Sequence, residues 1–159
     1  REDTMSVKHK IRKAMVMAAP DTSVRTLAVL MRDRHVGAVI ITEKDRPVGI
    51  VTDRDVVSRV VAPDRDPLSV RARDIMSTDL VVAREGTPLA EVTEQMRARG
   101  IRRVPLVDGK GRLVSIFTLD EILVVVGDEI ANLGRAVLAG ISKEHLRGRA
   151  VRLRSAVGS

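Results

Sequence analysis

The sequence contains no cysteine, which excludes disulfide bonds and thiolate metal sites within the chain. It also lacks tryptophan and tyrosine, and Phe117 is its single phenylalanine, so aromatic platforms for stacking single-stranded nucleic acid are missing. No apolar run approaches the roughly 20 residues that a membrane-spanning helix requires, so we expect no membrane segment. With 44% hydrophobic and 31% charged residues, the 159-residue chain is predicted to be soluble and globular.

The chain also lacks a grouping of residues typical of catalysis. Its three histidines, His9, His35 and His145, lie in separate segments, and none has a second ligand at the i, i+4 spacing of a helical metal site. No motif combines a nucleophile, a base and an orienting group, so we expect a protein that is not an enzyme. Residues 1–4 lack the apolar segment of a secretory signal, and a cytoplasmic location is therefore expected.

Positive charge is abundant, but it lies at the two ends of the chain. The formal net charge is +7. Residues 1–13 carry five bases and two acids, residues 142–154 carry five bases and one acid, and the remainder is neutral. A basic terminal segment is more typical of a solvated tail than of a nucleic-acid reader. Nucleic-acid binding through the basic tail is therefore kept only as a weaker alternative.

A stretch near the middle of the chain has a second copy further along. Residues 49–55 (Gly-Ile-Val-Thr-Asp-Arg-Asp) join an apolar run to a hydroxyl and two carboxylates, which is typical of a strand turning into a helix. Residues 115–122 repeat the order small, two apolar, Thr, two variable, acid, apolar, with Thr118 lying 66 positions after Thr52. Upstream the offset is 65, because the turn at 108–111 is one residue longer than its counterpart. The chain therefore contains an internal repeat.

Each copy is predicted to form the order strand, helix, strand, strand, helix. In the first copy, capping residue types at 21–23 precede Val24, Leu27 and Met31 at the spacing of one helix face, and Gly37 is expected to end this helix. The elements expected in the first copy are strand 15–18, a helix from 24, strands 38–41 and 48–51, and helix 53–61. Those expected in the second copy are strand 80–82, a helix capped by Thr87 with Pro88 at its first position, strands 104–107 and 113–117, and a helix from Leu119.

These elements divide the chain into four parts. We expect a first repeat at 7–62, a linker at 63–69, a second repeat at 70–126, and a C-terminal helix and basic tail at 127–159. The linker holds two prolines and shows no apolar pattern. Beyond the second repeat the helical apolar period continues, although interior glycines weaken it.

This arrangement resembles the tandem cystathionine β-synthase (CBS) domain pair, also called a Bateman module. The resemblance rests on Pro-Asp-Thr-Ser-Val at 20–24, the motif at 49–55 and Ile-Arg-Arg-Val-Pro at 101–105, all in register with the doubled element order. It implies an α/β (α+β) fold in which two βαββα repeats pack through their sheets around a pseudo-twofold axis. It further implies two clefts for adenine nucleotides (AMP, ADP or ATP) or related adenosyl ligands, in a stand-alone regulatory module that acts on an unknown partner protein.

The Thr and the acid of each copy have two interpretations. Thr52 with Asp55, and Thr118 with Glu121, fit the capping box, in which hydroxyl and acid satisfy backbone amides at a helix start. The resemblance implies that they also face a cleft, where a carboxylate binds a ribose diol and the helix N-terminus attracts phosphate. Asp55 matches the family pattern, whereas Glu121 is one methylene longer, with Asp120 beside it as a substitute. The first ribose site is therefore expected to be the better one.

Two adjacent arginines, Arg102 and Arg103, are expected to begin a strand, where neighbouring side chains point to opposite faces. The resemblance implies that a basic residue here reaches the ligand's phosphates, whereas the matching pair of the first copy, Gly37-Ala38, offers only backbone and space. Mg²⁺ held by Asp53 and Asp55 beside a phosphate is kept as a variant, and no other cofactor is expected. The expected ligand-binding residues are Val16, Gly49, Ile50, Thr52, Asp53, Asp55, Val81, Arg102, Arg103, Thr118, Asp120 and Glu121.

The last helix of each repeat carries more apolar surface than a small two-layer unit can bury. Its apolar residues are Val56, Val57, Val60 and Val61 in the first copy and Ile122, Leu123, Val125 and Val126 in the second. A patch of this kind marks an interaction surface, so we expect a homodimer built from these helices. A ligand-free protein–protein interaction scaffold is the alternative function.

Overall fold

The computed structural model describes residues 15–156, with side chains described up to residue 141. The basic segment at 1–13, which contains His9, lies outside the described residues, and so do the side chain of His145 and residues 157–159. The chain forms two compact units that meet at Leu119, the first at residues 1–119 and the second at residues 120–159. Both β-sheets belong to the first unit.

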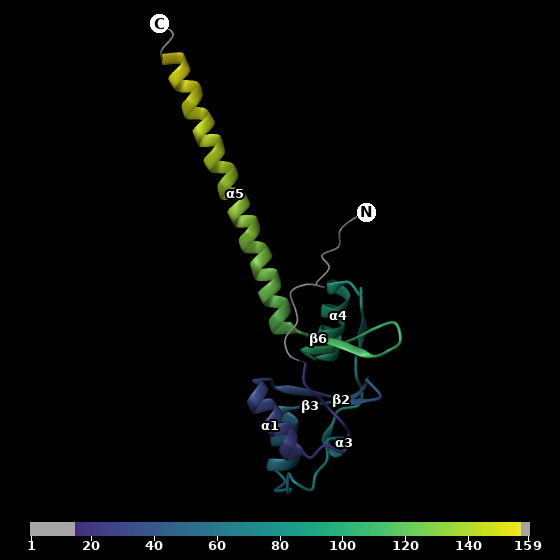
Figure 1. Cartoon of the computed structure of the whole chain (residues 1–159). Coiled ribbons are helices and arrows are strands. Elements are labelled where there is room, and N and C mark those ends of the chain that lie inside the picture. Colours follow the sequence, from purple (N-terminus) through teal and green to yellow (C-terminus); the bar gives the residue numbers. More distant parts are fainter. Residues whose placement is uncertain (1–14, 157–159) are drawn as a thin grey trace. The chain divides into compact units, whose positions relative to one another are not determined.

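The first sheet has three strands in the order β1-β2-β3. Strand β1 (Met17–Ala18) runs parallel to β2 (Ala38–Glu43), which pairs antiparallel with β3 (Arg46–Thr52). The apolar run that predicts β2 is buried along its length, at Val39, Ile40 and Ile41. Helix α1 (Val24–Arg34) connects the two parallel strands β1 and β2 (Figure 1).

Helix α1 forms as the spacing of its apolar residues predicts. The Ser23 hydroxyl accepts a hydrogen bond from the Thr26 amide at 3.2 Å, and the stripe of Val24, Leu27 and Met31 is buried. The predicted end at Gly37 is wrong. The helix ends two residues earlier, because His35 takes the left-handed C-cap conformation with φ at 52°.

The helix expected at 53–61 is present, but in two geometries. Helix α2 (Asp53–Val56) is α-helical and begins after the cap residue Thr52. Segment η2 (Val57–Val61) has the wider π-helical turn, in which the Ala62 amide donates to the Val57 carbonyl at 2.8 Å.

The segment that follows the linker enters the core of the first repeat. A short helix, α3 (Ala72–Ile75), is absent from the sequence-based prediction, since four residues are too few to show a helical period. Val70, Ala72 and Ile75 are buried in one apolar cluster with α1, β2 and β3. The core of the first repeat therefore includes residues that the sequence pattern assigns to the second.

The second sheet has the order β4-β5-β6 and repeats the topology of the first. Strand β4 (Ala83–Arg84) is parallel to β5 (Arg103–Val107), and β5 is antiparallel to β6 (Leu113–Thr118). Helix α4 (Leu89–Arg99) connects β4 to β5. The strand predicted at 80–82 is wrong in position, because the first strand of this sheet begins at Ala83.

Thr87 does not cap helix α4, contrary to the prediction. Its hydroxyl accepts a hydrogen bond from the Arg84 amide at 3.1 Å, within the turn that precedes the helix. Pro88 occupies the cap position, where the structure shows no side-chain hydrogen bond. Thr87 therefore stabilises the turn rather than the helix start.

The longer turn of the second copy is organised by one carboxylate. Asp108 Oδ1 accepts hydrogen bonds from the backbone amides of Arg112 at 2.9 Å and Lys110 at 2.8 Å. The hydrogen bond from the Arg112 amide is the main cause that lowers the pKa of Asp108. The Arg112 guanidinium and the Lys110 amide lower this pKa further. The turn thus accommodates its additional residue with its own set of hydrogen bonds.

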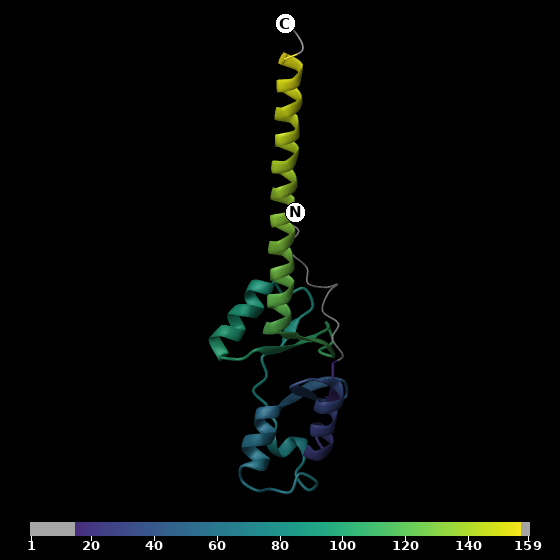
Figure 2. The same ribbon diagram turned by 90° about the vertical axis from the view of Figure 1, so that its left-hand side faces the viewer.

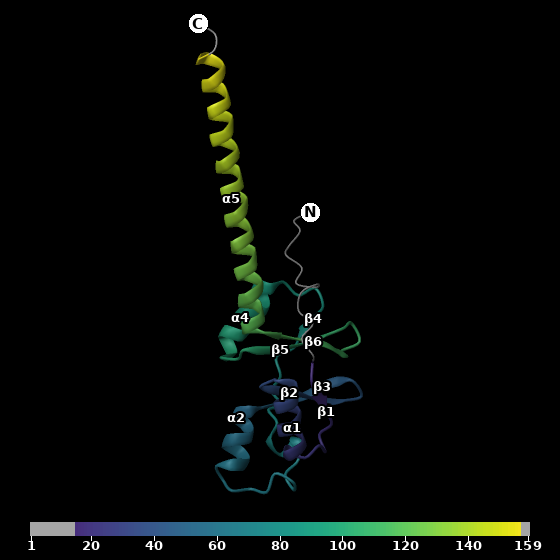
Figure 3. The same cartoon turned by 60° about the vertical axis from the view of Figure 1, so that its left-hand side comes forward.

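Hydrogen bonds link the two repeats within the first unit. The Leu113 amide of β6 donates to the Asp45 carbonyl in the β2–β3 turn at 2.8 Å, and Ile50 of β3 exchanges two hydrogen bonds with Ser77, at 3.1 and 2.9 Å. In Figure 3 the two sheets lie between α1 and α2 on one side and α4 on the other. The fold is α/β, with two three-stranded sheets and helices, as the sequence predicts.

Helix α5 (Leu119–Ala156) forms the second unit from Asp120 onward. The helix expected from Leu119, the further helix expected beyond Val126 and most of the expected tail are one continuous helix of 38 residues (Figure 2). Gly127, Gly134 and Gly140 lie inside this helix without ending it. None of the helices in the described part of the chain combines the length and the apolar character that crossing a membrane demands.

Candidate functional site

A cavity of about 320 Å³ is lined by residues of both repeats, all within the first unit. This volume lies at the lower end of the range typical of small-molecule sites. The lining residues are Ile50, Thr52, Asp53, Arg54 and Asp55 from β3 and α2, Ser77, Asp79, Leu80 and Val81 from the segment before β4, and Gly100, Ile101, Arg102 and Arg103 from the start of β5. Seven of the expected ligand-binding residues therefore meet here: Ile50, Thr52, Asp53, Asp55, Val81, Arg102 and Arg103.

Gly49 and Val16 do not line this cavity, and each packs against other residues instead. A Cβ placed on Gly49 would lie 2.4 Å from Met76 Sδ, so this glycine permits Met76 to pack directly on the backbone of β3. Val16 is half-buried and packs against the apolar cluster of the first repeat. Both residues therefore support the strands that carry the cavity.

The second motif contributes no residue to the lining of this cavity. Thr118, Asp120 and Glu121 are not among its lining residues. Thr118 and Glu121 have polar contacts of their own. The second cleft, and the capping box formed by Thr118 and Glu121, stay predictions.

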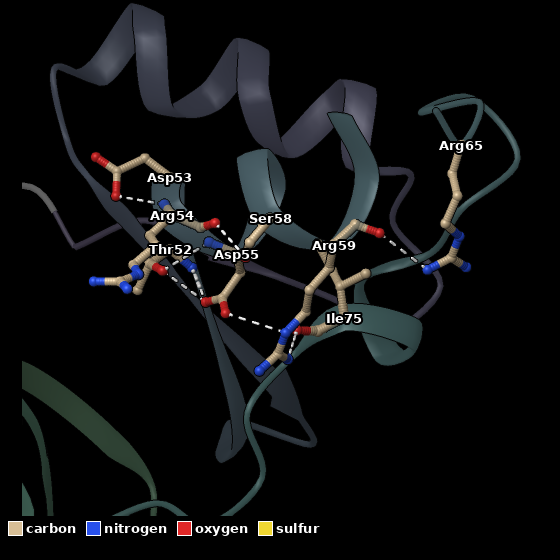
Figure 4. A network of polar contacts seen from close by, with 8 residues as sticks. All are labelled: Thr52, Asp53, Arg54, Asp55, Ser58, Arg59, Arg65 and Ile75. Atoms are coloured by element: carbon tan, nitrogen blue, oxygen red, sulfur yellow. Dashed lines mark hydrogen bonds and ion pairs between the residues drawn. The ribbon is translucent and has the colours of Figure 1, made fainter. Parts of the chain in front are cut away.

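The first motif forms the predicted capping box (Figure 4). Asp55 Oδ2 accepts two hydrogen bonds from Thr52, one from its backbone amide at 2.9 Å and one from its hydroxyl at 2.6 Å. In return, the Thr52 hydroxyl accepts from the Asp55 amide at 3.2 Å. The capping box therefore fixes the positions of the Thr52 hydroxyl and of Asp55 Oδ2.

The other oxygen of Asp55 faces a cation. Asp55 Oδ1 lies 3.5 Å from Arg59 Nε, and the Arg59 guanidinium also donates to the Ile75 carbonyl, as Figure 4 shows. The Asp55 side chain is only 14% exposed. This carboxylate is therefore held in one orientation beside the cavity, and Oδ1 keeps a lone pair for a further donor.

The two arginines of the second repeat both line the cavity, although neighbouring strand residues are expected to point to opposite faces. The reason is that β5 begins at Arg103, so Arg102 precedes the regular strand. A Cβ placed on Gly37 would lie 3.0 Å from Arg103 Nη2 and 3.1 Å from Asp53 Oδ2. The matching glycine of the first repeat thus provides space into which a cation from one repeat and an anion from the other extend.

Six lining residues are missing from the sequence-based prediction: Arg54, Ser77, Asp79, Leu80, Gly100 and Ile101. Arg54 lies inside the 49–55 motif and Ile101 inside the 101–105 motif, so these two motifs could have indicated that both residues line the site. Ser77, Asp79 and Leu80 lie in an irregular segment without any periodicity. Asp79 is paired at the surface with Arg99, whose Nη1 lies 2.9 Å from Asp79 Oδ2.

The lining combines three kinds of chemistry. Ile50, Leu80, Val81 and Ile101 supply apolar surface, Asp53, Asp55 and Asp79 supply carboxylates, and Arg54, Arg102 and Arg103 supply guanidinium groups. Carboxylates accept hydrogen bonds from hydroxyl groups, and guanidinium groups bind phosphate with a fixed fork of donors. Among the described residues, no group of three or more His, Cys, Asp or Glu side chains is arranged to hold a metal ion. The arrangement therefore suits an organic ligand with an apolar part, hydroxyls and phosphate.

Comparison with known proteins places the chain in a family. The family model of the CBS domain matches twice, at residues 7–62 and 72–128. The two matches cover most of the chain, and the chain therefore belongs to the CBS domain family, with two copies of the domain in tandem.

Two relatives from different organisms match most of this chain. The chain is 38% identical over 123 residues to an uncharacterized protein of Methanopyrus kandleri, a match that covers 77% of this chain and 63% of that protein. It is 33% identical over 122 residues to the CBS domain-containing protein YhcV of Bacillus subtilis, covering 75% of this chain and 84% of YhcV. The chain thus spans somewhat less than two thirds of the Methanopyrus protein and most of YhcV.

A solved structure of the same fold contains a nucleotide. It is the CBS domain protein PAE2072 of Pyrobaculum aerophilum, complexed with AMP. This chain matches it with a TM-score of 0.64 and 26% identity, over 69% of this chain and 84% of that one.

Proposed function

We propose that this chain is a regulatory module that binds an adenine nucleotide in the cavity lined by its two CBS domains. The observation that carries the proposal is the composition of the cavity wall, in which apolar side chains, carboxylates and three arginines from both repeats meet. The complex of PAE2072 with AMP, in a similar fold, supports this class of ligand.

The three parts of a nucleotide fit three parts of the lining. The adenine ring lies against Leu80, Val81 and Ile101, whose apolar side chains can cover the flat faces of the base. The ribose hydroxyls donate to Asp55 Oδ1 and to Asp53, because Asp55 Oδ2 already accepts two hydrogen bonds from Thr52. The capping box and the proposed ribose contact therefore use different oxygens of the Asp55 carboxylate.

The phosphates lie toward Arg102, Arg103 and Arg54 in this proposal. The guanidinium of Arg103 is next to the space at Gly37, where it can donate to a phosphate oxygen. A ligand with more than one phosphate can add Mg²⁺ held by Asp53, a variant that uses one protein carboxylate and the phosphate oxygens.

The proposed role is sensing rather than catalysis. Nucleotide binding stabilises one arrangement of the two repeats, because the lining residues come from both, and a partner protein recognises that arrangement. The partner is a protein that the module regulates in the cytoplasm. If the cavity bound no ligand, the scaffold alternative would take the place of this proposal.

A thermal-shift panel with AMP, ADP, ATP, S-adenosylmethionine and NAD tests the proposal. A ligand present at about 100 times its dissociation constant adds about 2.7 kcal/mol to the folded state, which raises the melting temperature by several degrees. Arg103→Ala is expected to reduce the shift, whereas Arg34→Ala, an equal change of charge at an exposed position outside the cavity, is expected to leave it intact. Absence of a shift with all five ligands would contradict the proposal.

A further inference from the structure

Arg59 connects a carboxylate of the cavity to the backbone that leads into the cavity wall (Figure 4). Its Nε lies 3.5 Å from Asp55 Oδ1, and its Nη1 donates a hydrogen bond to the carbonyl of Ile75, the last residue of α3. These two acceptors belong to separate helices, α2 and α3. One guanidinium therefore holds a side chain and a main-chain carbonyl together, which its rigid fork of donors permits.

An ordinary surface ion pair does not account for this arrangement. A pair of exposed side chains at i, i+4 adds little to stability, because holding two long side chains in one geometry costs entropy. The Asp55 side chain, however, is only 14% exposed. Thr52 donates to its Oδ2, while Arg59 faces its Oδ1. Both oxygens of this carboxylate are therefore held in place before a ligand arrives.

The second copy of the repeat lacks this cation. The two motifs are 66 residues apart, so Val125 takes the position that Arg59 has in the first copy. Helix α5 forms at that position with a valine. An arginine is therefore not needed to build the helix that follows the motif, and its role in the first copy is to be sought in its two contacts.

The Ile75 carbonyl lies two residues before the wall of the cavity. The wall residues that follow it are Ser77, Asp79, Leu80 and Val81. Ser77 is attached to the sheet, because its backbone exchanges two hydrogen bonds with Ile50, at 3.1 and 2.9 Å. Arg59 adds a second attachment at the start of this segment, and it is the one that links the segment to Asp55.

We propose that Arg59 is a positioning residue for ribose recognition, an inference that rests on the proposed function. Arg59 is not among the residues that line the cavity, so it acts through the groups that it holds. It keeps Asp55 Oδ1 in the orientation that accepts from the ribose hydroxyls, and it keeps the wall at 77–81 in place relative to that carboxylate. Selection of a ribonucleotide over a deoxyribonucleotide therefore depends on an arginine outside the lining.

The test compares AMP with 2′,3′-dideoxy-AMP, which lacks both ribose hydroxyls, by calorimetric titration of the full chain. The ratio of the two dissociation constants is the readout, since a general loss of stability weakens both ligands alike. We expect the wild type to prefer AMP about tenfold or more, as loss of a charge-assisted hydrogen bond predicts. In Arg59→Met this ratio should fall about threefold or more, and Asp55→Asn/Arg59→Met should match Asp55→Asn, because the arginine acts through the carboxylate.

Arg65→Met is the matched control. It removes the same charge six residues further along, where the guanidinium donates to the Arg59 carbonyl at 3.3 Å rather than meeting Asp55. We expect it to keep the ratio of the wild type. A ratio that is unchanged in Arg59→Met, or that falls equally in Arg65→Met, would overturn the inference while the proposed function stands. Absence of AMP binding by the wild type would instead overturn the proposed function, and this inference with it.

A second variant covers the case in which Arg59→Met does not fold. Arg59→Lys keeps a point charge on a long side chain but lacks the fork that serves two acceptors at once. The preference for AMP should therefore fall in this variant too, by less than in Arg59→Met. A folded Arg59→Lys protein with the wild-type ratio would overturn the inference.

Discussion

Asp55 accepts hydrogen bonds from the backbone amide and the hydroxyl of Thr52 with a single carboxylate oxygen, at 2.9 and 2.6 Å, while its second oxygen lies 3.5 Å from Arg59 Nε and the residue lines the cavity. The same residue therefore closes the capping box of α2 and, in our proposal, presents an acceptor to a ligand. These two roles can be separated by substitution, since they depend on different properties of the carboxylate: position for the cap, and charge for the ligand.

Asp55→Ala is expected to lower both stability and affinity. Loss of the cap costs about 1 kcal/mol of folding free energy. Loss of a charge-assisted hydrogen bond to the ribose costs about 1.5–3 kcal/mol of binding free energy, roughly tenfold or more in affinity. Asp55→Asn keeps an oxygen that accepts from Thr52, so we expect it to melt closer to the wild type while still binding more weakly. Denaturation and calorimetric titration of the three proteins check this.

Glu121→Ala is the control for position, because the first motif is predicted to be the better ribose site. It is expected to weaken binding less than Asp55→Ala does. If Asp55→Ala melts slightly lower than the wild type yet binds nucleotide equally well, the capping box accounts for the motif and the ribose assignment is wrong.

Gly49→Ala is expected to destabilise the fold through Met76. An added Cβ would lie 2.4 Å from Met76 Sδ and 3.1 Å from Met76 Cβ, so moving the end of the side chain is not enough to relieve the clash. Overpacking of this kind costs about 1–3 kcal/mol. The double variant Gly49→Ala/Met76→Ala should recover part of the loss in a urea titration, and a double variant no more stable than Gly49→Ala would contradict this account of the glycine.

The sequence predicts best those features that depend on neighbouring residues. The Thr52–Asp55 cap spans three positions, and the stripe of α1 spans two helical turns, so both are visible as spacing. The space at Gly37 is different, because it depends on Arg103, which approaches from the other repeat. Likewise, Ala72 and Ile75 are buried by tertiary packing, and their helix has only four residues, which is too short to show a helical period in the sequence.

Removal of residues 142–159 is expected to leave folding and cavity binding unchanged. The cavity and both sheets lie before this segment in the chain. The chain truncated after Ile141 should stay soluble, melt near the full-length protein and bind nucleotide with the same affinity. Loss of soluble protein, or of affinity, would show that the basic segment supplies packing or phosphate contacts.

Only some of the apolar residues expected at the homodimer surface are exposed in the structure. Val60 and Ile122 are buried, whereas Val57 and Val61 are 59% and 64% exposed. We propose that the exposed valines of η2 contribute to self-association. Val57→Ser/Val61→Ser should lower the apparent mass in light scattering at micromolar concentration, relative to Ser58→Ala on the same segment. A wild-type chain with the mass of a monomer would refute self-association through this surface.

Calorimetric titration of the full chain with AMP, in parallel with GMP and adenosine, tests the central claim most directly. We predict saturable binding of AMP, weaker binding of adenosine because it lacks the phosphate that Arg102 and Arg103 contact, and weaker binding of GMP. Arg103→Ala should bring the affinity for AMP close to that for adenosine. Absence of binding heat with AMP, ADP and ATP at several temperatures, in a protein shown to be folded, would contradict the claim that this cavity senses adenine nucleotides.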